Sequence, residues 1–287
     1  MDILDYAFMQ RALIAAALVG ITAPAIGTYL VQRRQALMGD GLGHVAMTGV
    51  ALGLVLHTSP VWMATLVAVL GAVGMELIRA RGRTSGDVAL AMLFYGGLAG
   101  GVMIINLGGG QTASLLGSMF GSITTVAAED VTAMAILAAF VLAVAIGLRR
   151  QLFAVCQDEE FARVTGLPVR ALNLLIAVTA AVTVTVAMRI VGLLLVSAML
   201  VIPVAAAQRL TRSFATTLGL AMAISVTVSL TGTAATYYMD VPSGATIVLL
   251  AIGVFMVMTA LSAPLARRRA KAARAAEEVC TRDDVKV

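Results

Sequence analysis

Asp40 and His44 are the residues of this sequence whose types and spacing best suit metal chemistry. They lie in the segment 38–44, which reads Met-Gly-Asp-Gly-Leu-Gly-His. Residues four apart lie on the same face of an α-helix, so a carboxylate oxygen and an imidazole nitrogen would be presented together. Both are ligands of Zn²⁺, Mn²⁺ and Fe²⁺. Two ligands do not complete a coordination shell, and a second copy of the chain across a two-fold axis could supply two more.

A structural interpretation of the same segment stays open. Asp40 would then cap the helix that follows, and His44 would hydrogen-bond within the protein. The glycines at positions 39, 41 and 43 also permit a broken helix, whose free backbone groups would face a cavity.

Four further residues are candidates for special roles. His57, the only other histidine, lies in a His-Thr-Ser-Pro turn; it is either an ordinary surface residue or a group that helps to admit the metal. Glu129 and Asp130 follow an amphipathic stretch at 115–128, where we favour capping of the next helix over a cation-attracting mouth of the metal pathway. Pro203 lies within an apolar run and predicts a kink in its helix.

The elements that must position these residues are apolar helices. Apolar residues make up 60% of the 287 positions and charged residues 12%, whereas a soluble domain carries roughly a quarter charged residues. Runs of a length that crosses a bilayer recur along the chain, and helices satisfy the backbone polar groups inside lipid. The predicted fold class is therefore all-α, a polytopic transmembrane helical bundle. Its runs cover 8–31, 42–56, 61–78, 88–107, 131–148, 171–187, 191–207, 214–237 and 245–264.

The distribution of basic residues predicts the orientation of this bundle. All of the 20 Lys and Arg except Arg11 and Arg189 fall between alternate runs or in the tail, and the positive-inside rule places those clusters in the cytoplasm. The C-terminus is then cytoplasmic, and the N-terminus is outside if there are nine spans. The run at 42–56 is short and Gly-rich, so a re-entrant segment, leaving eight spans, stays open.

Two regions follow from this pattern. We expect a transmembrane domain at 1–266 and a charged cytoplasmic tail at 267–287, whose basic cluster at 267–274 would contact anionic membrane lipid. The net charge of +5 does not indicate a nucleic-acid partner, because no basic stripe is interleaved with aromatic residues.

The cytoplasmic segment at about 156–168 differs from its neighbours because it is polar. It predicts a short helix that ends at Gly166, before Pro168. It is either an ordinary connector or a docking helix for a soluble partner. The chain has no Gly-x-x-x-x-Gly-Lys-Ser/Thr loop, so we expect any ATPase activity to reside in a separate subunit.

Five stretches together carry a family resemblance. They are 37–44, 116–127 with Phe-Gly-Ser at 120–122, 158–169, 191–203 and 242–248. In this order and spacing the chain resembles the membrane-spanning permease of ABC-type zinc, manganese and iron importers, the ABC-3 family. Many relatives have Ser before the histidine, Pro four residues after it and Thr before the intramembrane proline; this chain has Gly43, Thr48 and Ile202 there.

The resemblance implies a homodimeric pore in the plasma membrane of a prokaryote, a cytoplasmic ABC ATPase and an extracytoplasmic metal-binding protein. It implies transport of a divalent metal, Zn²⁺ or Mn²⁺ ahead of Fe²⁺, with no permanently bound cofactor. The positions that match Asp40 and His44 would contact the ion. The segment that looks like the ATPase-coupling helix offers Asp158, Glu159, Glu160, Ala162, Arg163 and Gly166.

Two rival functions remain. A self-sufficient secondary transporter or channel would need more ionisable groups along its spans, because coupling to protons or Na⁺ requires them. An intramembrane enzyme using Asp40 and His44 would need a third chemical group, and the sequence indicates none.

Overall fold

The computed structural model describes residues 6–81, 86–109, 126–239 and 241–262. These residues form helices and no strand, which confirms the predicted fold class. The segment 115–125, which holds most of the expected amphipathic stretch, and the tail 267–287 lie outside the described residues. The helices are α1 (Ala7–Gln32), α2 (Met38–Val55), α3 (Pro60–Ala80), α4 (Gly86–Leu107), α6 (Ala128–Gly147), α7 (Arg149–Gln157), α8 (Glu159–Val164), α9 (Val169–Val191), α10 (Leu193–Leu210), α11 (Phe214–Met239) and a last helix, Ser243–Ser262.

Nine of the described helices are long and apolar enough to span a membrane. The uncertain segment is one of them: α2 is a continuous helix of 18 residues. The alternative of a helix broken at its glycines is therefore wrong. The hydropathy of α2 is low for a span, and most of the helix is buried against other helices. At such helix–helix contacts small residues such as glycine permit close approach, and they contribute less hydropathy than large apolar residues.

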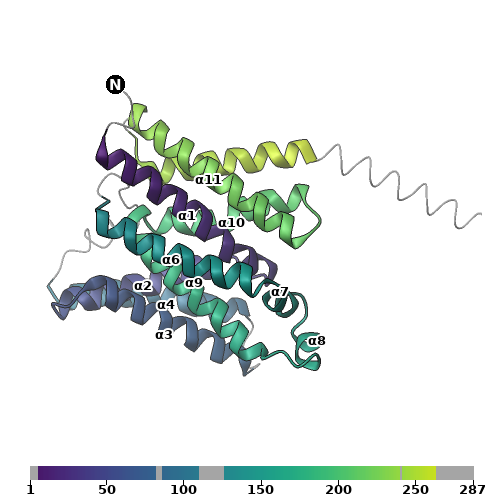
Figure 1. Cartoon of the computed structure of the whole chain (residues 1–287). Helices are drawn as coiled ribbons and strands as arrows, with labels where there is room; N and C mark the ends of the chain where they lie inside the picture. Colours follow the sequence, from purple (N-terminus) through teal and green to yellow (C-terminus); the bar gives the residue numbers. More distant parts are fainter. Residues whose placement is uncertain (1–5, 82–85, 110–125, 240, 263–287) are drawn as a thin grey trace, which may run out of the picture.

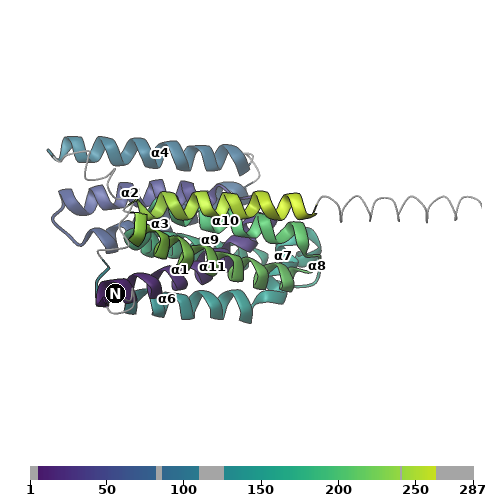
Figure 2. The ribbon, with the colours of Figure 1, turned by 90° about the horizontal axis from the view of Figure 1, so that it is seen from above.

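The long helices run side by side, and α7 and α8 lie at the end of the bundle opposite the start of α1 (Figure 1). α1, α2 and α9 are the spans most buried within the chain. α1 packs against α11, α10 and α6, whereas α2 packs against α4 and α3. Seen from above, α4 lies at one edge of the bundle and α6 at the opposite edge (Figure 2).

Pro203 lies inside α10 and is buried. Its ring removes one backbone hydrogen bond from this helix, and the expected kink there stays a prediction. α1 likewise contains a buried proline, Pro24; Thr28 donates a side-chain hydrogen bond to the Pro24 carbonyl at 2.7 Å.

Candidate functional site

Asp40 and His44 both lie in the first two turns of α2. The helix is capped by Leu37 without a side-chain hydrogen bond, and Asp40 is already inside the first turn. The interpretation of Asp40 as the capping residue is therefore wrong. Its carboxylate is free of that role and remains about one-third exposed.

The hydrogen bond of His44 identifies the nitrogen that can bind a metal. His44 Nδ1 lies 2.8 Å from the backbone oxygen of Asp40 and 3.9 Å from Asp40 Oδ1. A carbonyl oxygen only accepts, so Nδ1 is the donor, and in the neutral imidazole Nε2 is then the nitrogen with a lone pair. Histidines that bind metals commonly donate from the other ring nitrogen in this way. The ring is also held by Phe94, at 4.2 Å between centroids.

Ser197 of α10 is a partner of Asp40 that sequence reasoning missed. Its hydroxyl donates a hydrogen bond to Asp40 Oδ1 at 3.3 Å. Two glycines of α2 face α10: a Cβ at Gly39 would overlap the end of the Leu200 side chain, and one at Gly43 would overlap that of Leu193, so larger residues there would displace these leucines. Gly43 stands where many relatives have serine, and the space that a larger side chain would need is filled here by Leu193.

α4 approaches α2 equally closely from another side. A Cβ on Gly97 would lie 2.6 Å from the backbone nitrogen of Val45. Thr48, which stands where relatives often have proline, donates a hydrogen bond to the Gly97 carbonyl at 2.6 Å. These contacts fix the wall that α4 forms beside Asp40.

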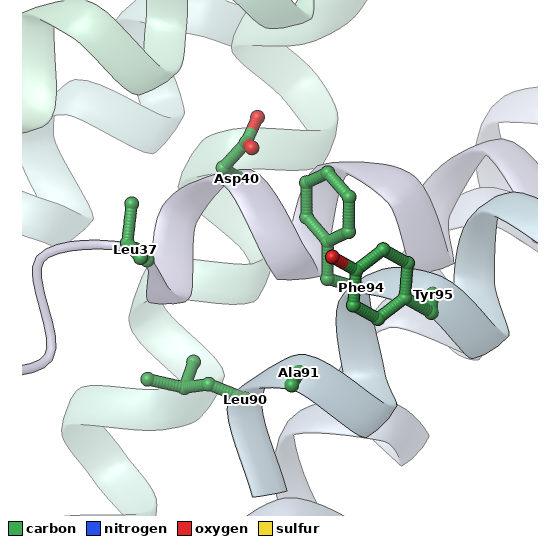
Figure 3. A pocket seen from close by; sticks show the side chains of 6 residues that line it. All are labelled: Leu37, Asp40, Leu90, Ala91, Phe94 and Tyr95. Atoms are coloured by element: carbon green, nitrogen blue, oxygen red, sulfur yellow. The ribbon is translucent and has the colours of Figure 1, made fainter. Parts of the chain in front are cut away.

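A cavity of about 290 Å³ lies between the start of α2 and α4. Asp40 stands at its rim, and its carboxylate points away from Leu90 and Ala91 of α4 (Figure 3). The rings of Phe94 and Tyr95 complete the apolar wall. Among the residues that the structure describes, no three His, Cys, Asp or Glu side chains gather closely enough to hold a metal. One chain thus offers two ligands here.

The structure does not bring His57 to this pair. His57 follows the far end of α2 with a φ of 51°, and the Thr58 amide donates back to the Gly53 carbonyl at 2.9 Å. This arrangement closes the helix in the left-handed conformation typical of helix ends. At a rise of 1.5 Å per residue, His57 is about 25 Å along α2 from Asp40.

Asp130 is engaged in structural contacts at the start of α6. It accepts a hydrogen bond from the Ala127 amide at 3.1 Å, as in the favoured capping interpretation. Its carboxylate also lies 3.5 Å from Arg189 of α9. Glu129 lies exposed in the same first turn. A role of either residue in the metal pathway stays a prediction.

The expected coupling helix exists as α8, and its residues divide between two faces. Asp158 caps it by accepting from the amides of Glu160 and Phe161. Ala162 is fully buried, and Gly166 takes a φ of 83° that favours glycine. Glu160 and Arg163 lie on the exposed side.

Two apolar residues on that exposed side were missed from the sequence. Phe161 is 63% exposed and Val164 87% exposed. They are three positions apart, so they share one face of α8. The sequence could have predicted this exposed apolar face, because two large apolar residues stand three positions apart in an otherwise polar helix. Exposed apolar side chains beyond the membrane spans indicate a surface that another protein covers.

Glu159 points into the bundle and joins α8 to α1, α3 and α9. Its Oε1 lies 2.6 Å from Arg79, 3.4 Å from Arg33 and 3.1 Å from the Asn173 amide nitrogen. Burial by itself raises the pKa of the Glu159 carboxyl, but the hydrogen bond and charge of Arg79, with smaller effects of Arg33 and Asn173, hold that pKa below its usual range.

These features define a class: a membrane-spanning transport subunit with a carboxylate and an imidazole one helical turn apart on one span and a short helix beyond the spans at one end. Residues 5–262 match the ABC 3 transport family, and the chain belongs to that family. It is an importer-type ABC permease, as the sequence predicted.

Known relatives agree with this assignment. The chain is 32% identical to the "Manganese transport system membrane protein MntC" of Halalkalibacterium halodurans, covering 88% of this chain and 87% of the relative. It is 31% identical to the "Probable iron transport system membrane protein" of Haemophilus influenzae, covering 90% and 95%. The solved structure "PsaBC from Streptococcus pneumoniae in complex with Fab" matches with a TM-score of 0.79 and 29% identity, covering 89% of this chain and 92% of that chain.

Proposed function

We propose that two copies of this chain form the translocation pathway of an ATP-driven importer for a divalent transition metal. One observation carries the proposal: Asp40 presents a partly exposed carboxylate one helical turn from the buried His44, whose Nδ1 donates to a backbone carbonyl, so that Nε2 is the metal-binding nitrogen of the neutral ring. This pair supplies one hard and one intermediate ligand, a set suited to Mn²⁺, Fe²⁺ or Zn²⁺.

The dimer follows from the number of ligands. Two side chains from one copy leave a divalent ion under-coordinated. A two-fold axis beside the start of α2 brings a second carboxylate and a second imidazole to the same ion. Four protein ligands shared between two copies bind the ion transiently and release it when the copies separate.

Manganese is the first choice of ion, ahead of zinc and iron. The relatives above are named for manganese and iron, and carboxylate ligands suit Mn²⁺ well. An extracytoplasmic metal-binding protein would deliver the ion to the outer side of the bundle.

A partner ATPase would act through α8. Phe161 and Val164 offer an apolar docking face, and the exposed Glu160 flanks it with a negative charge. Closure of the ATPase would displace α8, and the ion pairs of Glu159 would pass that displacement to α1, α3 and α9. Alternating access then reflects a shift between two states of the dimer.

The test is uptake of ⁵⁴Mn²⁺, ⁶⁵Zn²⁺ and ⁵⁵Fe²⁺ by cells expressing this chain with its ATPase and binding protein. We expect His44→Ala and Asp40→Asn to abolish uptake at matched membrane expression. His57→Ala is the matched control, because it removes the other histidine far from the pair. Unchanged uptake in His44→Ala would contradict the proposed site, whereas loss of uptake in His57→Ala would assign His57 to the admission of the metal.

The rival secondary transporter is tested in the same cells. Depletion of ATP with the proton gradient maintained should stop uptake by an ABC importer. A protonophore with ATP maintained should stop a proton-coupled transporter instead. Uptake that survives ATP depletion would overturn the ATP-driven mechanism.

A further inference from the structure

A second cavity, of about 390 Å³, lies where α3, α8 and α9 meet. It is separate from the cavity beside Asp40 and shares no lining residue with it. Three arginines line it, one from each region: Arg79 of α3, Arg163 of α8 and Arg170 at the start of α9. The positive-inside rule places this end of the bundle at the cytoplasmic surface.

The carboxylates near this cavity are already neutralised. Arg79 binds Glu76 at 2.8 Å and Glu159 at 2.6 Å. Arg33 lies 3.6 Å from Glu76 and 3.4 Å from Glu159. Glu76 and Glu159 themselves line the cavity, and Arg33 and Arg79 balance their two charges.

Arg163 and Arg170 remain without such compensation. Both are exposed, and neither makes an ion pair with any residue in the described part of the chain. The first turn of α9, which also lines the cavity, adds the positive end of a helix dipole. The cavity therefore attracts an anion.

Part of the cavity lining is apolar and comes from candidate membrane spans. Leu77 of α3 and Leu174 of α9 belong to this part, and they are 55% and 36% exposed. Both lie within membrane spans, where exposed leucines contact acyl chains. A soluble anion would gain nothing from contact with these leucines. A phospholipid would pair its phosphate with the arginines and pack its acyl chains against the leucines.

We propose that this cavity binds the phosphate of an anionic phospholipid from the cytoplasmic leaflet. Arg163 and Arg170 would hold the phosphate oxygens, since guanidinium groups bind phosphate through paired hydrogen bonds. The acyl chains would lie along Leu77 and Leu174. The bound headgroup would tie the docking helix α8 to the start of α9, so membrane composition would influence the helix that contacts the ATPase.

Native mass spectrometry of the full transporter, purified in a mild detergent, tests this site. Phosphatidylglycerol and phosphatidylcholine are titrated in parallel, and we expect preferential retention of phosphatidylglycerol. Apparent affinity for phosphatidylglycerol should fall about 5-fold for each arginine removed in Arg163→Gln and Arg170→Gln. The lysine replacements at both positions should retain most of the binding, because the charges remain.

The matched control is Arg150→Gln with Arg212→Gln, which removes two exposed cytoplasmic arginines outside the cavity. An equal fall in the control would mean that lipid binds by net charge alone, and would overturn the proposal. Unchanged binding in the Arg163 and Arg170 variants would also overturn it. Displacement of the lipid by millimolar inorganic phosphate would assign the site to a soluble anion instead. If the variant that carries both Arg163→Gln and Arg170→Gln does not fold, each single variant can be compared with the control in the same way.

Discussion

Arg79 and Glu159 lie 80 positions apart in the chain and form an ion pair with an N···O distance of 2.6 Å. The first ends a membrane span and the second begins the short helix α8. The side chain of Arg33, which is only 4% exposed, approaches the same glutamate. α8 is therefore attached by charge to the ends of α1 and α3, while Phe161 and Val164 face outward.

Removing the Glu159 charge should destabilise the chain. Glu159→Gln leaves Arg33 and Arg79 with one carboxylate in place of two, and we expect the free energy of unfolding to fall by about 1–2 kcal/mol. Glu160→Gln is the matched control, because Glu160 is exposed. Thermal unfolding in detergent should separate the two variants by a few degrees in Tm. Equal Tm values would contradict the anchoring role of Glu159.

The same carboxyl should make stability depend on pH in acid. Its folded-state pKa lies below the ordinary value of 4.5, so its contribution is complete above about pH 4.5 and is lost as the pH falls through the folded-state pKa. The Tm difference between the unsubstituted chain and Glu159→Gln should therefore be constant near neutrality and shrink below pH 4.5. A difference that grows on acidification would reverse the sign that we assign.

Ser197 should tune the metal site without being one of its ligands. Ser197→Ala removes the hydroxyl that donates to Asp40 Oδ1, and loss of such an outer partner typically weakens metal binding about 10-fold. We expect the KM for metal uptake to rise while the amount of protein in the membrane is unchanged. Ser225→Ala, which removes a buried hydroxyl that contacts Met199, should leave KM as it was. A normal KM in Ser197→Ala would show that Asp40 needs no such support.

Adjacent glycines of α4 should respond in opposite ways to alanine. A Cβ at Gly97 would collide with the backbone of α2, whereas one at Gly96 would meet nothing within 4 Å. We expect Gly97→Ala to cost about 1–3 kcal/mol through forced separation of the helices. Gly96→Ala should be neutral or raise stability by up to about 1 kcal/mol, because alanine favours the helix. Similar Tm values for the two variants would contradict the close contact of α2 and α4.

Cys156 should react slowly with alkylating reagents. Burial raises the pKa of its thiol to about 12, and the thiolate is the reactive form. In a Cys280→Ser background, iodoacetamide should label the folded protein at pH 8 far more slowly than the same protein unfolded in detergent. The rate should keep rising with pH beyond 9. Rapid labelling of the folded protein would show that the thiol is accessible and ionised.

Much of this protein is determined by local sequence. The positions of the spans follow from apolar runs, because a segment that crosses lipid must be long, apolar and helical whatever its neighbours are, whereas the choice between eight and nine needed the continuous helix α2. Asp40 and His44 could be paired from the sequence because residues four apart lie on the same face of an α-helix. The cap at Asp158 and the end at Gly166 are also local, since each depends on the few residues beside it.

The tertiary structure decided the roles that depend on other helices. The glycines of α2 permitted a broken helix, but α2 is intact, and a Cβ at Gly39 or Gly43 would overlap Leu200 or Leu193 of α10. Ser197 gained its importance only because α10 lies against the start of α2. Glu159 and Glu160 are the same residue type in adjacent positions, yet one is paired with buried arginines and the other faces solvent. Sequence spacing defines a face within one helix, whereas the partner of that face is set by long-range packing.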